Sequence, residues 1–421
     1  MKDTGQSPAP GKENLKEHLG AGLCPQVFET FEGLNLSMKV SELLKLIPAD
    51  TLRDLAVETK VDFQVKKLSG EVMFKLILFS MLGSGKLSLR VMEKFLQSAK
   101  FKSFSQFDIL DTKYNSIRDR ICTINAAYFE KLFEEIFCIY NKELKEQKAL
   151  SKTDSTYVGL ATNLFLGGMK NSNNDVDKRF VKYSVNIKGS LPSLVKVFTD
   201  QSYISEEFAL AELINDAGCI EGNIVVFDRG LQSRNSFDKF TDGHKSFVSR
   251  ANPKIRCNVT LRNEVTVKPA KSSVTITSDE VGYLINKKEK NSKHLYRIIK
   301  GTIDESGDKI YFVTNILNED AYLIAAWYKQ RWEIEVFFKF IKQHLNVNHL
   351  VSRDANGIKV MIYMTMILAI LIIVYKKLNR IKGFKIAKLS FEIELENEII
   401  KTIVLLCGGD PTRAPHLFSS G

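Results

Sequence analysis

The first third of the chain shows a helical pattern of apolar positions. From about residue 37 to 147 the pattern is helical, with short interruptions. The clearest helical stretches are 72–82, 87–96 and 128–144. Several short helices in a basic segment are typical of a module that reads DNA, and they are equally typical of a scaffold that only packs. Residues 1–22 are rich in Lys, Gly and Pro, which predicts disorder.

The pattern changes from helices to strands after about residue 180. Residues 182–188 alternate between polar and apolar side chains, as a strand does, and 194–199 are expected to form its hairpin partner. A helical stretch follows at 206–217. Residues 223–227 then form a continuous apolar run that ends at Asp228. Such a run predicts a buried central strand that ends at a site.

Short strands dominate the next part of the chain, up to residue 314. The expected strands are 247–250, 257–261, 274–277 and 311–314, separated by polar, Lys-rich turns. Roughly 60 residues of β structure therefore separate the strand that ends at Asp228 from the helix around residue 335.

Residues 360–375 form a run without a charged side chain. The run is shorter than the roughly 20 residues that span a bilayer, so we expect a helix that is buried on all sides. A membrane protein built on this run is a weaker alternative, because nothing else in the chain supports it. Beyond residue 376 we expect one more helical stretch, and 408–421 read as irregular.

Composition narrows the class of protein. The 421 residues are 44% hydrophobic and 26% charged, enough for two or three domains with cores. A net charge of +11 and a pI near 9.1 fit a polyanionic partner, and they equally fit a merely basic soluble protein. The six cysteines form no close pairs, which excludes a zinc-finger spacing or a disulfide framework and suits a reducing cytoplasm. Residues 1–20 have no apolar core, so we expect no signal peptide.

A polar stripe stands out on the expected helix from Tyr328 to Lys342. At about 100° per residue, one narrow face of this helix carries Tyr328, Arg331, Glu335 and Lys342. The opposite side is apolar, and Glu333 falls toward it, so Glu335 is the acid that shares the stripe. Cations on such a face can hold phosphate oxygens, and the acid can help to hold a metal. Taken alone, the stripe is more typical of a solvated surface with ion pairs one turn apart.

Two further acids complete a candidate site with Glu335. Asp154 lies where the strand-rich part begins, and Asp228 follows the best central strand, where a side chain projects over the edge of the sheet. Alone, an Asp after a strand is more often a turn or cap residue. Two Asp from neighbouring strands and one Glu from a later helix are the parts of a two-metal site. Hard divalent cations such as Mg²⁺ prefer carboxylate oxygens.

The order of these motifs resembles a known family. The chain is similar to the DDE transposases of bacterial insertion sequences, and more narrowly to the insertion-sequence-four family with its Tyr–Arg–Glu–Lys signature. The resemblance covers roughly residues 150–350 and rests on five features in order: Asp154-Ser155-Thr156, Val225 to Gly230, Phe247 to Arg250, Val313 to Ile316, and Tyr328-x2-Arg331-x3-Glu335-x6-Lys342.

The resemblance implies an α/β fold with a ribonuclease-H-like catalytic core, interrupted by a β-rich insertion and flanked by helical N- and C-terminal regions. The expected parts are a disordered 1–22, a helical, DNA-end-binding 23–148, a core of 149–250 and 315–350, an insertion of 251–314, and a helical 351–421.

The resemblance also implies the roles of individual residues. Asp154, Asp228 and Glu335 are expected to be catalytic and to hold Mg²⁺, for which Mn²⁺ substitutes. The residues expected to bind DNA are Tyr328, Arg331, Lys342, Arg229 and Trp332, although Arg229 is equally expected to form a structural salt bridge. Residues 251–314 contain no tryptophan with which to hold a flipped base, so a hairpin intermediate stays an open question.

The implied activity is cleavage at the terminal inverted repeats of an insertion sequence and joining of the ends to target DNA. The implied partners are double-stranded DNA and a second copy of the chain, and the implied location is the nucleoid in a bacterial cytoplasm. Two alternatives remain: a stand-alone metal-dependent nuclease, and a catalytically silent repressor that binds element ends.

Overall fold

The computed structural model describes residues 38–108, 112–144, 150–160, 168–170, 179–216, 223–286, 288–345, 347 and 350–415. The disorder expected for residues 1–22 concerns a segment outside these ranges. Residues 38–421 group into one compact unit, to which everything below refers.

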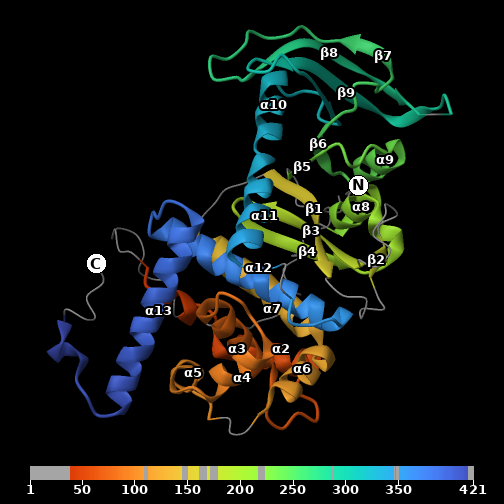
Figure 1. The fold of residues 1–421 in the computed structure, drawn as a ribbon. Helices are drawn as coiled ribbons and strands as arrows, with labels where there is room; N and C mark the ends of the chain where they lie inside the picture. The colour runs from red at the N-terminus through yellow and green to blue at the C-terminus, as the bar shows by residue number, and fades with distance from the viewer. Residues whose placement is uncertain are drawn as a thin grey trace, which may run out of the picture. The chain divides into compact units, whose positions relative to one another are not determined.

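Within the described residues, ten strands form one mixed sheet (Figure 1). Nine of them follow the order β2-β3-β1-β5-β6-β10-β9-β8-β7, and β4 pairs with β3. The first six strands are β1 (Leu150–Leu160), β2 (Met169–Lys170), β3 (Arg179–Lys188), β4 (Leu191–Phe198), β5 (Ile224–Phe227) and β6 (Ser246–Arg250). The remaining strands are β7 (Cys257–Arg262), β8 (Val274–Ile285), β9 (Asn291–Ile303) and β10 (Lys309–Thr314).

Strand β1 is where the sheet changes character. It pairs antiparallel with β3, with Asp154 opposite Val185, and parallel with β5, with Lys152 opposite Val226. Strand β5 is in turn parallel to β6. Because β5 is buried between two parallel neighbours, it is the continuous apolar run that the sequence predicts, and the residue after it lies at the carboxyl edge of the sheet.

The strands expected between residues 246 and 314 are confirmed, and one more is present. Strand β10 pairs antiparallel with β6, and β9, β8 and β7 follow in antiparallel order. Strand β9 was not predicted from the pattern of polar and apolar residues. In the structure, β8 and β9 pair along most of their length. The β-rich segment is therefore a continuation of the same sheet.

The N-terminal region is helical, as predicted. Its helices are α1 (Val40–Lys45), α2 (Ala49–Thr59), α3 (Gly70–Gly83), α4 (Leu89–Gln97), α5 (Ala99–Ser105), α6 (Tyr114–Thr123) and α7 (Ala126–Glu143). Ser69, Ser88 and Ser98 begin three of these helices by accepting a hydrogen bond from a first-turn amide. Their apolar residues join one hydrophobic core with α12 (Ala355–Leu378) and α13 (Phe384–Leu406).

Helix α12 contains the uncharged run at 360–375. It is long and apolar enough to cross a membrane, and almost all of its apolar stretch is buried inside the protein. It packs on α7, α13 and β4. The predicted burial on all sides is confirmed, because α12 is the shared centre of the helical core.

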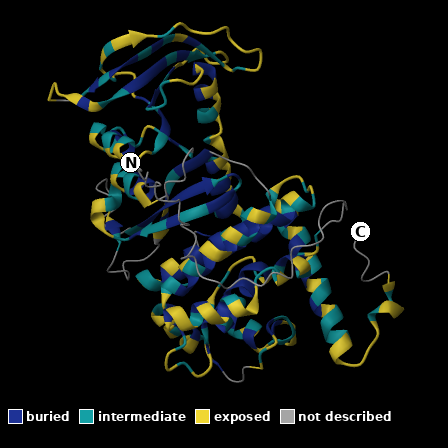
Figure 2. Cartoon of the chain, turned by 180° about the vertical axis from the view of Figure 1, so that it is seen from behind, coloured by how far each residue is buried: buried dark blue, intermediate teal, exposed yellow. Residues whose placement is uncertain are grey.

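Figure 2 shows exposed positions along α13, which include Ile386 and Ile393.

The remaining helices border the sheet. They are α8 (Glu206–Asp216), α9 (Arg234–Asp242), α10 (Ala321–Lys329) and α11 (Trp332–His344), with two short 3₁₀ turns at Gln201–Ile204 and Pro411–Arg413. Helix α11 contacts β1, and α10 contacts β6 and β8. Segments far apart in the sequence therefore meet at β1 and β5.

Candidate active site

Alternate side chains of β1 reach α11 and the residue before it. Side chains two residues apart in a strand point to the same face, which groups Lys152, Asp154 and Thr156. The Lys152 ammonium donates to Glu333 Oε2 at 2.9 Å. One Asp154 oxygen lies 3.8 Å from the Arg331 guanidinium. The Lys342 ammonium donates to the Thr156 hydroxyl. One face of one strand thus contacts α11 at two points and the residue before it at a third.

Asp228 lies beside this face, directly after β5. Its Oδ1 accepts a hydrogen bond from the Gly230 amide at 2.8 Å, which holds the turn that follows the strand. Asp154 has a side chain only 16% exposed. Burial first, and then the negative charge of Asp228, raise the pKa of Asp154 to about 7. The two carboxylates predicted from neighbouring strands therefore lie close enough to repel each other.

Glu335 joins the site through Arg331. The Arg331 guanidinium donates to Glu335 Oε1 at 2.5 Å, and the same side chain faces Asp154. Burial raises the pKa of Tyr328, which also feels the charge of Asp228. The Arg331 guanidinium carbon lies 5.7 Å from the centre of the Tyr328 ring. The three predicted acids and the predicted Tyr and Arg are thus brought together.

Lys342 completes the polar stripe on α11. Burial lowers the pKa of Lys342, and the charge of Asp154 opposes that shift. Its bond to Thr156 places a cation next to the strand that carries Asp154. A cation held in this position is available to a phosphate oxygen that approaches the acids.

The helix that carries the stripe is not continuous, contrary to the expectation from the sequence. Helix α10 ends at Lys329 and α11 begins at Trp332. The junction is closed by tighter bonds to the third preceding residue, from the Arg331 amide to Tyr328 O at 3.0 Å and from the Ile334 amide to Arg331 O at 3.1 Å. A stretch of 3₁₀ bonding within a helix often marks a functional hinge or a sequence under strain.

Glu333 was expected on the apolar side of this helix, and that expectation is wrong. Its side chain is 53% exposed and pairs with Lys152, which is itself almost completely buried. The buried ammonium also donates to Gly189 O at 2.6 Å. Glu333 therefore satisfies a structural lysine, while Glu335 faces the site.

The two remaining predicted DNA contacts lie on the surface. The Trp332 side chain begins α11 and is 64% exposed. Arg229 is exposed and has no hydrogen bond or ion pair within the described ranges. The salt bridge offered as its structural role is therefore absent from that part of the chain.

Three charged residues that the sequence did not single out also belong to this neighbourhood. Burial and the charge of Asp228 raise the pKa of Glu206, and Lys182 opposes the shift. Glu206 is so close to the turn after β5 that a Cβ on Gly230 would lie 2.3 Å from its Oε2. Arg250 ends β6, and its charge acts on Tyr328. Two features of the sequence could have pointed to these residues. One is the glycine at position 230, which leaves room for Glu206, and the other is Arg250 at the end of a strand that runs parallel to β5.

The donor set suits a hard divalent cation. Asp154 and Asp228 are carboxylates that repel each other, and a divalent ion between them would relieve that repulsion. Across the described ranges, no group of three His, Cys, Asp or Glu side chains is arranged to hold a single ion. The Glu335 carboxylate is engaged by Arg331.

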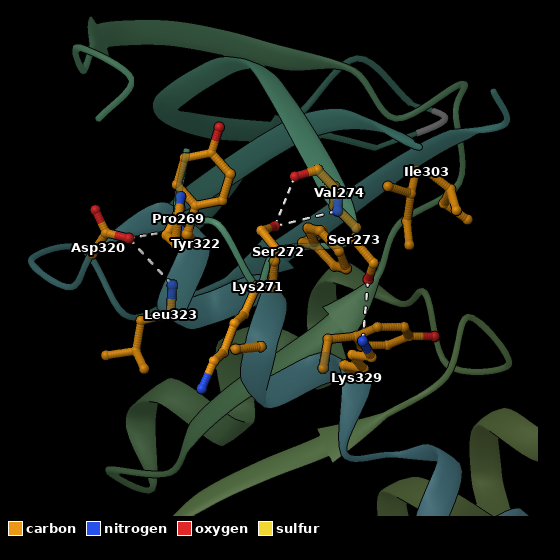
Figure 3. A pocket seen from close by; sticks show the side chains of 15 residues that line it. Pro269, Lys271, Ser272, Ser273, Val274, Ile303, Asp320, Tyr322, Leu323 and Lys329 are labelled. Atoms are coloured by element: carbon orange, nitrogen blue, oxygen red, sulfur yellow. Dashed lines mark hydrogen bonds between the residues drawn. The ribbon is translucent and has the colours of Figure 1, made fainter. Parts of the chain in front are cut away.

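An apolar cavity of about 510 Å³ adjoins the site on the side of the β-rich segment (Figure 3). Its walls come from α10 and from strands β8 to β10, and include Val274, Ile303, Phe312 and Tyr328. At its rim Lys329 donates to the Ser273 hydroxyl at 3.3 Å. Tyr328 is therefore shared between the cavity and the acidic site.

Comparison with known proteins finds a family that matches part of the chain. Residues 186–372 match the family described as "Transposase DDE domain". This segment includes Asp228, Arg331, Glu335 and Lys342, whereas Asp154 precedes it. Less than half of the chain is therefore similar to this family.

The similar curated proteins are named as transposases. A transposase for insertion sequence element IS5377 from Geobacillus stearothermophilus is 26% identical over 217 residues, which cover 52% of this chain and 54% of that protein. The transposase y4zB from Sinorhizobium fredii is 29% identical over 38% of this chain and 44% of its own length. A transposase for element IS4SA from Synechocystis is 25% identical over 70% of this chain and 90% of its own length. The chain thus spans about half the length of the first two relatives and most of the third.

Among solved structures, the piggyBac transposase in a synaptic complex with hairpin DNA is similar with a TM-score of 0.45 at 10% identity. The similarity covers 90% of this chain and 84% of that one.

Proposed function

We propose that this chain is a DNA transposase that cleaves at the terminal inverted repeats of an insertion sequence and joins the freed ends to target DNA. The observation that carries the proposal is the meeting of Asp154, Asp228 and Glu335 with Arg331 and Lys342, from segments up to 181 residues apart, counting from 154 to 335. The transposase DDE domain at residues 186–372 supports the same activity.

The site's own residues define how DNA is held. Arg331 and Lys342 are half-buried cations, so a phosphate between them gains charge-assisted hydrogen bonds in a partly water-excluded place. Arg331 bonds to Glu335, so a phosphate oxygen that binds to this guanidinium competes with the Glu335 carboxylate for its donors.

Asp154, Asp228 and Glu335 would hold divalent metal ions, for which we propose Mg²⁺ with Mn²⁺ as a substitute. When bound, such ions neutralise charge on the attacking and leaving oxygens of the phosphodiester. The repulsion between Asp154 and Asp228 supports this assignment, because two close carboxylates are stabilised by a cation and not by each other.

We further propose a ribonuclease-H-like core and membership of the insertion-sequence-four family. The mixed sheet supports the former, with β1 between antiparallel β3 and parallel β5 and the acids at its edge. The spacing of Tyr328, Arg331, Glu335 and Lys342 supports the latter.

We propose that two copies act together on two DNA ends, at the nucleoid of a bacterial cell. Helix α13 supports a self-association surface, because Ile386, Leu389 and Ile393 are about half exposed at spacings of three and four residues. Their helix neighbours Ala387 and Phe391 are fully buried on the other side.

The test is cleavage of a duplex that carries the inverted repeats found beside the gene. We expect Glu335→Gln to abolish cutting in Mg²⁺ or Mn²⁺ while binding to the ends stays within about twofold, because one metal-binding oxygen is lost and the fold is kept. Glu305→Gln is the matched control, since Glu305 is an exposed turn residue without a side-chain partner in the described chain, and it should cut normally.

Three outcomes separate the alternatives. Cutting by Glu335→Gln at the normal rate would show that Glu335 is not the assigned ligand. Wild-type protein that binds ends but nicks nothing in either metal is the repressor. Wild-type protein that cuts but never joins ends to a target duplex is the stand-alone nuclease.

A further inference from the structure

A second cleft, rich in cations, lies next to the acidic site. It has a volume of about 730 Å³ and is lined by the turn after β5, the first residues of α9, the loop from β6 to β7, and the turn from β8 to β9. Its charged lining residues are Arg234, Lys254, Arg256, Lys288 and Glu207. Glu289 pairs with Arg256 at 2.6 Å, so four cations stand against two acids and the cleft is electropositive.

The cleft is built from loops that side chains hold in place. The Gln232 amide donates to Arg250 O at 3.0 Å and accepts from the Asn252 amide at 3.1 Å, which ties the two loops together. The Arg256 guanidinium donates to Asn286 O at 3.0 Å. The Asn286 side chain in turn accepts from the Lys288 amide at 2.8 Å. The cations are therefore presented by a fixed frame.

Arg234 is short of acceptors. Its Nη1 donates to Gln232 O at 2.6 Å, while its buried Nε has no partner. Burial lowers the pKa of Arg234, the charge of Arg256 lowers it further, and Glu207 opposes both. The ammonium groups of Lys254 and Lys288 have no partner within the described part of the chain. An anion would supply the charge and the acceptors that the protein does not.

The cleft and the acidic site share their boundary. Glu207, which lines the cleft, follows Glu206, whose carboxylate lies against the turn that holds Asp228. Gln232 and Arg234 are four and six residues beyond Asp228 on the same loop and helix. The cleft and the acidic site are therefore built from the same loop after β5 and the same start of α8.

We infer that this cleft binds the phosphodiester backbone of duplex DNA beside the reacting phosphate, through Lys254, Lys288, Arg234 and Arg256. The inference rests on the proposed function and extends the DNA path beyond the Tyr–Arg–Glu–Lys stripe toward the β-rich segment. The cations contact phosphates and no bases, so the contact is independent of DNA sequence.

The experiment is the salt dependence of DNA binding by the full-length chain, measured by fluorescence anisotropy with a duplex of arbitrary sequence and with EDTA present. Each phosphate contact contributes about 0.9 to the slope of log K against log salt. The double variant Lys254→Ala/Lys288→Ala should lower that slope by about 1.8, so that wild-type affinity falls about 12-fold more than the variant's between 50 and 200 mM salt.

The control is the double variant Lys382→Ala/Lys385→Ala. These lysines are also exposed and without a partner in the described ranges, but they lie around the start of α13. The control should keep the wild-type slope. An unchanged slope for the cleft variant, or an equal drop for both variants, would overturn the inference.

A separate nicking assay distinguishes the two proposals. If the cleft variant has a smaller salt slope but wild-type protein never nicks DNA in Mg²⁺ or Mn²⁺, backbone binding by the cleft is supported and the proposed transposase activity is refuted. If wild-type protein nicks and the cleft variant keeps its slope, the activity stands and the cleft does not bind the backbone.

Discussion

A buried ion pair fastens the β-rich segment to the helix that leads into the site. Arg297 of β9 donates from Nε to Asp279 Oδ1 at 2.8 Å and from Nη2 to Oδ2 at 2.5 Å. The two side chains are only 5% and 1% exposed. The guanidinium also donates to the backbone oxygens of Leu317 and Glu319, just before α10 begins.

We expect Arg297→Met to lower the free energy of unfolding by about 3–5 kcal/mol. Methionine fills much of the same space, but it leaves the Asp279 carboxylate buried without its cation, and removing one partner of a buried pair has an effect of that size. The Asn263 amide, at 3.2 Å, is the remaining side-chain donor to that carboxylate in the described chain. Urea denaturation followed by circular dichroism measures the change.

Two comparison variants make the reasoning testable. Lys268→Met breaks an ion pair with Asp304 whose side chains are 36% and 37% exposed, and it should leave the free energy of unfolding almost unchanged. The double variant Arg297→Met/Asp279→Leu should recover most of the loss, because a buried pair can be replaced by apolar residues at little cost. A loss below about 1 kcal/mol for Arg297→Met, or no recovery in the double variant, would refute the argument.

Two further predictions concern the acidic site. The pKa of Asp154 is about 7 in the folded chain against an ordinary 3.8, so the folded chain binds this proton more tightly than the unfolded chain does. In EDTA, the free energy of unfolding should therefore fall as the pH rises from about 4 to 7, by at most about 4 kcal/mol. Urea titrations at several pH values should show that Asp154→Asn lacks this part of the decrease, and an identical pH dependence in both proteins would contradict it. Lys342→Ala and Arg331→Ala should each weaken binding to a pre-cut DNA end and lower its salt slope by about 0.9, measured by anisotropy. An unchanged slope would make them ordinary surface charges.

Much of the sheet around β5 could be predicted because burial there is apolar. Residues 223–227 carry no polar side chain after Asn223, so β5 is recognisable, and Asp228 marks its end. Likewise, the burial of α12 follows from a run without charges. In both cases the residue types alone predict that the segment is buried.

The features that were missed depend on partners distant in sequence. Strand β9 contains Arg297, which is buried because Asp279 neutralises its charge. The pattern of polar and apolar residues alone predicts that such an arginine is exposed. Glu206 begins α8 like any solvated helix-start acid, and its place beside Asp228 arises only from the packing of α8 on the sheet. The break between α10 and α11 leaves the apolar pattern intact, so periodicity does not reveal it.

The three contacts from β1 to α11 and to Arg331 all require side chains that point to the same face of the sheet. Lys152, Asp154 and Thr156 all occupy even positions, and a shift of the backbone by one residue would send all three to the opposite side of the sheet. Such a slip would place Thr153 and Ser155 toward the helix, and the cations of α11 would meet hydroxyl groups in place of an acid. A misaligned β1 therefore loses the contacts to Glu333, Arg331 and Lys342 at the same time.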